Sequence, residues 1–167
     1  MHDELTLGDI QKMKEEIEHR TKVLRPLLLA EVKRTREYGD LSENYEYKAA
    51  KQEKNKNESR IRYLQQMIDT AIVVEKSGGA DTVGLFDRVT VYIPEDEEEQ
   101  VFKIVTTVRV NALEGIISKE SPIGSALMGH HVGDTVTIRV NDSYSYDMEI
   151  RAIDKGEDDG EIPINRY

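Results

Sequence analysis

The feature that most constrains the fold is a pair of apolar repeats that mirror each other along the first half of the chain. The first repeat has three- and four-residue spacing and contains Ile10, Met13, Ile17, Leu24 and Leu27. The second contains Ile61, Leu64, Ile68 and Ala71, and Asn57 and Lys54 continue its spacing backwards. Such spacing is typical of a coiled-coil seam. Each position in one repeat has a partner in the other that brings the sum of the two numbers to 81. A constant sum requires antiparallel helices, so the pattern predicts a helical hairpin with its turn centred between Asp40 and Leu41.

Two single residues refine this hairpin. Gly39 favours a helix end just before the turn, because glycine tolerates the positive φ that helix C-termini often need. Pro26 lacks a backbone N–H, so we expect it to bend the first helix. About thirty residues per arm give a rod of roughly 45 Å.

The second half of the chain changes from helical to alternating periodicity after a glycine-rich connection at residues 75–84. Strands are expected at 87–93, 101–110, 134–140 and 146–153. Between them, Ser121 and Pro122 have the residue types of a helix start, and Gly129 would end that short helix. The sequence therefore predicts an α+β protein of two domains, residues 1–76 and 77–155, followed by a mobile acidic tail at 156–167.

Composition narrows the class of protein. The chain has no cysteine, which excludes disulfides and thiolate metal sites. No apolar run reaches bilayer length, and residues 1–11 lack the basic and apolar regions of a secretion signal. We therefore expect a cytoplasmic protein that has no membrane partner.

Charge is unevenly distributed. The net charge is −10, yet the stretch 33–62 has nine basic and six acidic residues, whereas 76–167 has nine basic and eighteen acidic residues. A cationic segment on an anionic chain indicates local contact with phosphate. The alternative is a solvated helix face without a ligand.

Two carboxylates, Asp40 and Glu43, lie at the predicted turn, and two interpretations are open. Asp-x-x-Glu before a helix is close to a capping box, in which both side chains bind backbone N–H groups. Alternatively, the pair is half of a Mg²⁺ site, because this ion usually combines one or two carboxylates with phosphates. A partner that already holds one metal and a phosphodiester would complete a two-metal arrangement.

Two motifs carry a family resemblance: "GDLSENYEYKAAK" on the hairpin and "ISKESPIGSALMGHHVGDTVTI" in the second half. Together they resemble the GreA/GreB bacterial transcript-cleavage factors, and the match covers nearly all of residues 5–153. The resemblance implies a monomer whose N-terminal coiled coil enters the secondary channel of RNA polymerase. Asp40 and Glu43 would act there as catalytic and metal-binding residues, sharing a second Mg²⁺ with the polymerase. They would stimulate its cleavage of backtracked RNA, with no cofactor or hydrolytic activity of the factor's own.

The resemblance also implies contacts outside the acidic turn. Arg36, Lys48 and Lys51 lie where the family keeps basic residues that face the extruded RNA 3′ end. The C-terminal domain would be FKBP-like and would dock on the polymerase rim through Glu120, Ser121 and Pro122.

The sequence departs from the family pattern in three places. Thr106, Arg109 and Asn111 stand where glycine and acidic residues are expected, and Tyr45 is bulkier than the small residue often found beside the acids. The acidic tail after Lys155 is additional. These departures indicate a paralogue or a divergent member of the family more than its principal housekeeping copy.

Three rival functions remain open from the sequence. An inhibitor on the same scaffold would occupy the channel without promoting cleavage, and a coiled-coil adaptor would use the acids only as a cap. A prolyl isomerase is disfavoured, because such apolar sites are lined with aromatics and the chain has no tryptophan and only two phenylalanines, Phe86 and Phe102.

Overall fold

The computed structural model describes residues 3–37, 44–75, 79–158 and 160–166. They form two compact units: Ile10–Ala71 make up most of the first, and Glu4–Asp9 with Ile72–Arg166 make up the second. The two-domain α+β prediction is confirmed. The boundary differs from the predicted one after residue 76, because the N-terminal residues 4–9 belong to the second unit. No helix in these described ranges is long and apolar enough to cross a membrane.

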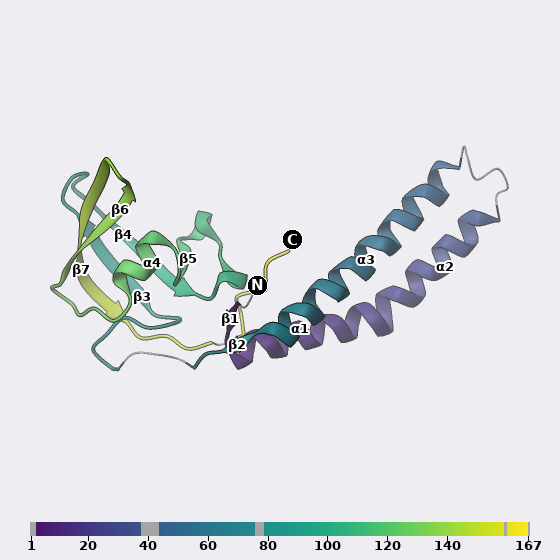
Figure 1. Ribbon diagram of the computed structural model, residues 1–167, viewed down its shortest axis with the longest axis horizontal. Helices are drawn as coiled ribbons and strands as arrows, with labels where there is room; N and C mark the ends of the chain where they lie inside the picture. The colour runs from purple at the N-terminus through teal and green to yellow at the C-terminus, as the bar shows by residue number, and fades with distance from the viewer. Residues whose placement is uncertain (1–2, 38–43, 76–78, 159, 167) are drawn as a thin grey trace. The chain divides into compact units, whose positions relative to one another are not determined.

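The first unit is the predicted antiparallel hairpin. One arm consists of α1 (Leu7–His19), the π-helical segment η1 (Arg20–Leu24) and α2 (Arg25–Arg36); the other is α3 (Tyr45–Thr70). Figure 1 shows the two arms side by side. Hydrogen-bonded pairs across the arms, such as Arg20 with Asn57 and Arg25 with Glu58, have position sums of 77 and 83, on either side of the predicted 81.

The π-helical segment shifts the seam by one residue. Its wider turn is closed by the Arg25 N–H, which donates to the Arg20 carbonyl five residues earlier. Beyond it, Val32 and Thr35 are buried in the seam. Leu27, which the sequence pattern placed in the seam, is 63% exposed. That prediction was wrong because the pattern assumed an uninterrupted α-helix, whereas a π-turn just before Pro26 rotates the following residues.

The middle of the hairpin is held by polar side chains. Glu16 accepts hydrogen bonds from Arg60 Nε at 2.8 Å and Arg20 Nε at 2.7 Å. Asn57, buried as the seam predicted, accepts from Arg20 Nη1 at 3.0 Å and donates to the Arg20 carbonyl at 3.1 Å. Partial burial acts to raise the pKa of Glu16, but the hydrogen bonds and charges of the two arginines outweigh it, so the pKa is lowered.

The second unit is built on a five-stranded sheet. Its strands are β3 (Arg88–Ile93), β4 (Glu98–Val105), β5 (Ile116–Ser118), β6 (Thr135–Asn141) and β7 (Tyr144–Asp154), in the order β5-β4-β3-β7-β6. Only the β4–β5 pair is parallel. The short helix α4 (Pro122–Leu127) packs on the sheet, and Leu127 joins a core cluster with Val89, Ile104 and Ile150 (Figure 1). A separate parallel ribbon joins β1 (Glu4–Leu5) to β2 (Ile72–Val73).

The strand predicted at 101–110 ends earlier than expected. β4 stops at Val105, and two 3₁₀ turns follow, η2 (Thr107–Arg109) and η3 (Ala112–Glu114). Gly115 ends the second turn with a φ of 73°, a conformation that favours glycine. These turns carry the unusual residues Thr106 and Arg109 away from the sheet ladder.

Arg109 is the centre of a buried polar network in the second unit. Its side chain is fully buried, and it donates to Asp9 and, through two nitrogens, to Asp158 at 2.7 and 2.6 Å. Thr106 Oγ1 also donates to Asp9, at 2.7 Å. Burial acts to lower the pKa of Arg109, but its bonds to the two carboxylates outweigh this and raise it.

The network also positions the end of the chain, for which the sequence predicted a mobile tail. Besides the pairing of Asp158, the Asn165 N–H donates to the Val108 carbonyl at 2.7 Å. Ile162 packs against an apolar cluster that contains Leu85 and Phe86. The described part of the tail therefore lies against the second unit. The tail and the unusual residues Thr106 and Arg109 are separate departures in the sequence, but in the structure they belong to one set of contacts.

Candidate functional site

The predicted catalytic and metal-binding carboxylates, Asp40 and Glu43, lie outside the described residues, in the connection between α2 and α3. The structure does describe the ends of both helices that lead into this connection. The site is therefore built from its flanks, which comprise the last turn of α2 and the first two turns of α3.

Asn44 organises these flanks. It is the N-cap of α3, with extended backbone angles (φ −84°, ψ 90°), and its Oδ1 accepts a hydrogen bond from the Tyr47 N–H at 3.0 Å. Its Nδ2 donates to the Thr35 carbonyl in the last turn of α2 at 2.6 Å. The capping-box interpretation assigned the cap to Asp40; the structure assigns it to Asn44, four residues later. Asp40 is thus not required to cap α3.

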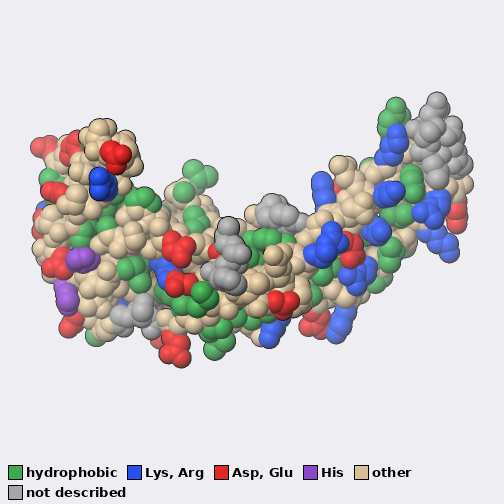
Figure 2. Space-filling model, in the orientation of Figure 1, with side chains coloured by type: hydrophobic (Ala, Val, Ile, Leu, Met, Phe, Trp, Pro, Cys, Tyr) green, Lys and Arg blue, Asp and Glu red, His purple; other side chains and the backbone are tan. Residues whose placement is uncertain are grey.

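The predicted RNA-contacting residues occupy the same end of the hairpin. Arg36, Lys48 and Lys51 are all exposed. Figure 2 shows Lys and Arg side chains gathered along this half of the hairpin. They lie on two helices of opposite direction, so the hairpin brings together cations that are distant in sequence. Their role as RNA contacts stays a prediction.

Two tyrosines are interleaved with these cations. Tyr45 is 79% exposed, and the Lys48 ammonium lies 5.6 Å from the centre of its ring. The Arg36 guanidinium lies 5.6 Å from the centre of the Tyr47 ring and donates to its hydroxyl at 3.4 Å. The site therefore presents both cationic groups and an exposed aromatic face.

The electrostatics of this end are positive. The hydrogen bond from Arg36 lowers the pKa of Tyr47, against a smaller opposing effect of burial. The charges of Arg36, Lys51 and Lys54 lower this pKa further, because they stabilise the phenolate. A phosphate group brought to this surface would experience the same attraction.

The three residues predicted to dock on a polymerase lie at the start of α4. Ser121 is the N-cap, as predicted: its hydroxyl accepts from the Gly124 N–H at 3.0 Å and donates to the Ser118 carbonyl at 2.6 Å. Glu120 and Pro122 are exposed on either side. Ser121 thus fixes the local backbone, and its two neighbours are the side chains that a partner can reach.

Neither site has a complete metal-binding group in the parts of the chain that the structure describes. No cluster of three or more His, Asp or Glu side chains occurs there in a suitable arrangement. This finding does not extend to the connection at 38–43, which contains Asp40 and Glu43.

Comparisons with known proteins identify the family. The N-terminal model of the transcription elongation factors matches residues 4–73, and their GreA/GreB C-terminal model matches residues 78–155. The chain belongs to the GreA/GreB family of transcription elongation factors. Transcription elongation factor GreA from Streptococcus pneumoniae (serotype 19F, strain G54) is 40% identical over 152 residues, covering 90% of this chain and 94% of the relative. GreA from Mesomycoplasma hyopneumoniae (strain 7448) is 37% identical, covering 84% and 88%.

Solved structures give a weaker match to this family member. GreA factor homolog 1 (Gfh1) of Thermus thermophilus is 25% identical, with 93% of this chain and all of that chain covered, at a TM-score of 0.43. A score this low supports no argument about function, so family membership stands on the sequence comparisons.

Sequence reasoning missed the residue that holds the site together. Asn44 is among the preferred N-cap residues, and it directly precedes the helical stretch that begins at Tyr45, so its type and position were an available signal. No sequence pattern indicates the hydrogen bond from Asn44 to Thr35, because that bond depends on how the two helix ends meet.

Proposed function

We propose that this family member inserts its hairpin into the secondary channel of RNA polymerase and stimulates the polymerase's own cleavage of backtracked RNA. Asp40 and Glu43 would act at the tip as ligands for a second Mg²⁺. The observation that carries the proposal is the capping of α3 by Asn44. Since the helix start is already satisfied, a capping role no longer accounts for the aspartate.

The chemistry requires a partner. Mg²⁺ prefers six oxygen ligands, and two carboxylates supply too few of them. A bound Mg²⁺ of this kind activates water and stabilises the oxygens of an in-line displacement. The hairpin's contribution is to deliver two anionic side chains, while the polymerase holds the first metal and the RNA. On this proposal the isolated factor has no hydrolytic activity.

The cationic flanks support the same arrangement. Arg36, Lys48 and Lys51 would contact the phosphates of the displaced RNA 3′ end and orient it toward the carboxylates. Exposed Glu120 and Pro122 would contact the outer rim of the polymerase. Binding through a second surface on the same chain raises the effective concentration of the tip in the channel.

The test compares Asp40→Asn and Glu43→Gln with the parent on stalled elongation complexes. Each amide keeps the size of the side chain and removes its charge, so polymerase binding should be retained while cleavage stimulation falls at least about tenfold. Raised Mg²⁺ should restore part of the activity by mass action. Glu46→Gln is the matched control: Glu46 is an exposed acid in the first turn of α3, and its loss should leave cleavage unchanged.

Two results would contradict the proposal. Full cleavage by both amide variants would show that the carboxylates are not ligands. A parent protein that binds polymerase and suppresses cleavage would instead support the rival function, a channel-occupying inhibitor.

A further inference from the structure

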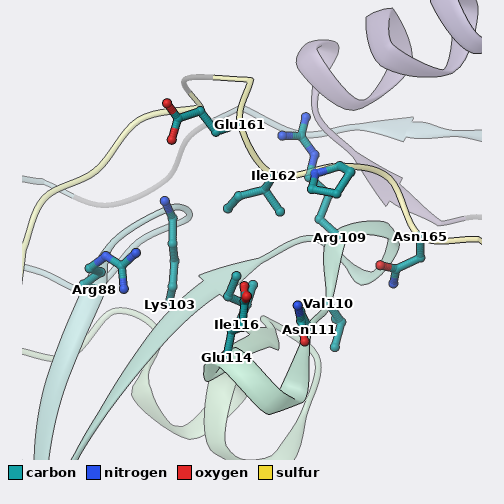
Figure 3. A pocket seen from close by; sticks show the side chains of 11 residues that line it. Arg88, Lys103, Arg109, Val110, Asn111, Glu114, Ile116, Glu161, Ile162 and Asn165 are labelled. Carbon is teal, nitrogen blue, oxygen red and sulfur yellow. The ribbon is translucent and has the colours of Figure 1, made fainter.

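A cavity of about 450 Å³ lies within the second unit (Figure 3). One side is formed by β3, β4 and β5, another by the turns around residues 109–114, and the last by the tail segment 161–165. Its volume is within the range of small-molecule sites. None of the roles argued above for the hairpin or for α4 involves this cavity.

Two cations lie side by side on the strands that line it. Arg88 on β3 is directly opposite Lys103 on β4 in the antiparallel register, so both side chains project from the same face of the sheet. Figure 3 shows both side chains at one end of the cavity. Like charges directly opposite each other destabilise a sheet. Among the described residues, neither cation forms an ion pair with a carboxylate. An anion bound between them would remove this repulsion.

The rest of the cavity has a different chemistry. Ile116, which is the neighbour of Lys103 on β5, and Ile162 of the tail supply apolar surface. Glu114 and Glu161 contribute two carboxylates, and Figure 3 shows them on opposite sides, with Glu161 on the tail. A ligand that extends from the cations toward these residues therefore needs an apolar or flat body with hydrogen-bond donors.

We propose that this cavity binds a small phosphate ester. Its phosphate would lie between Arg88 and Lys103, its body would pack against Ile116 and Ile162, and its donor groups would face Glu114 or Glu161. A phosphate suits the pair of cations better than a single carboxylate, because it carries up to two charges and three acceptor oxygens.

The net negative charge of the surrounding residues favours a small ligand over a nucleic acid. Residues 76–167 contain nine basic and eighteen acidic residues, so a long polyanion crossing this unit would be repelled outside the cavity. A single phosphate group needs only the local pair of cations. Asp154, which is opposite Arg88 on β7, offsets part of the charge of Arg88.

The experiment titrates the full chain with adenosine monophosphate, ribose 5-phosphate and inorganic phosphate, using calorimetry and amide chemical shifts. Adenosine monophosphate should bind at least about tenfold more tightly than inorganic phosphate, because its base adds apolar contact and donors. Shifts should concentrate at residues 88, 103, 111 and 116. Equal affinities for all three probes would overturn the assignment of the ester body, and no binding at millimolar concentration would overturn the site.

Two kinds of variant, expected to change the affinity in opposite directions, make this test more specific. Arg88→Gln and Lys103→Gln should each weaken binding by about tenfold or more, since each removes a charge-assisted bond. Glu161→Gln should tighten the binding of inorganic phosphate, because it removes a repelling charge. Arg139→Gln is the control: Arg139 is exposed on β6, at the far edge of the sheet, and its loss should change nothing. A thermal melt of each variant reports folding. Equal weakening by the Arg139→Gln control would show nonspecific charge binding and overturn the proposal.

Discussion

The Asn44 side chain joins the two arms of the hairpin at Thr35: its Nδ2 donates to the Thr35 carbonyl at 2.6 Å while its Oδ1 caps α3. One side chain thus satisfies a carbonyl at the end of one helix and an N–H at the start of the next. The Thr35 carbonyl also accepts from the N–H of the C-cap residue Glu37, whereas N–H groups in the first turn of a helix, such as that of Tyr47, have no partner within the helix. The bond fixes the spacing of the two helix ends from which the connection with Asp40 and Glu43 begins.

Asn44→Ala should therefore destabilise the hairpin by about 2 kcal/mol, since it removes an N-cap and a second hydrogen bond, each worth about 1 kcal/mol. Asn44→Asp keeps the cap and loses only the donor to Thr35, so about half of that loss is expected. Urea unfolding of the full chain, followed by far-ultraviolet circular dichroism, measures the difference. A loss in Asn44→Ala with no loss in Asn44→Asp would show that the bond to Thr35 adds no stability.

The shifted seam gives a second prediction. Val32 is 9% exposed and Leu27 is 63% exposed. Val32→Ala should cost about 1–2 kcal/mol of unfolding free energy because it removes buried apolar contacts. Leu27→Ala should cost less than about 0.5 kcal/mol. The same urea experiment tests the pair, and the reverse order would support the continuous α-helix assumed from the sequence pattern.

The contrast between these residues shows how far the sequence could predict the hairpin. The apolar spacing predicted antiparallel arms and the burial of Met13, Asn57 and Leu64, all of which are buried. It failed at Leu27 because a π-turn adds a residue to the helical repeat, and nothing in the spacing itself records that addition. Pro26 marked the right region for a disturbance but not its form.

In the second unit, too, the sequence predicted some features and missed others. Alternating residues predicted four of the five strands of the main sheet, and the residue types at 121 and 122 predicted the start of α4. The tail was predicted to be mobile because its composition is acidic and poor in apolar residues. Its contacts with the rest of the second unit depend on Asp158 meeting Arg109, two residues 49 positions apart. Such a pairing is set by tertiary structure and has no local pattern.

Asp158→Asn should release this part of the tail. The substitution removes the charge from a bidentate pair with a fully buried arginine, although Asp9 still contacts Arg109. We expect a loss of about 1–3 kcal/mol in the second unit. Hydrogen exchange of the Asn165 N–H, which is bonded to Val108, should become faster. Glu157→Gln removes the neighbouring exposed charge and should leave both measurements unchanged; an equal effect would assign the change to net charge.

The lowered pKa of Glu16 predicts how the hairpin responds to acid. Because the folded pKa lies below the ordinary value of 4.5, Glu16 contributes its full stability above that value. This contribution is lost as the pH falls through the folded pKa. Glu16→Gln lacks it at every pH, so the difference in unfolding free energy between parent and variant should narrow below about pH 4.5. Urea unfolding of both proteins across this pH range measures the difference in unfolding free energy. A difference that does not change with pH would contradict an ionised Glu16 between Arg20 and Arg60.

The cationic flanks of the tip lead to the last prediction. Lys48 and Lys51 are exposed on α3, and the positive potential that lowers the pKa of Tyr47 includes the charge of Lys51. If these lysines contact RNA phosphates, Lys48→Ala and Lys51→Ala should raise the factor concentration needed for half-maximal cleavage by several-fold at low salt. The defect should shrink as salt rises, because screening already weakens these contacts in the parent. Lys56→Ala is the matched control: Lys56 is exposed on the same helix and forms an ion pair with Glu53 at 3.5 Å. Lys56→Ala should leave the half-maximal concentration unchanged. A defect of equal size in all three variants would mean that binding to the polymerase depends on the overall charge of the hairpin and not on the two lysines near its tip.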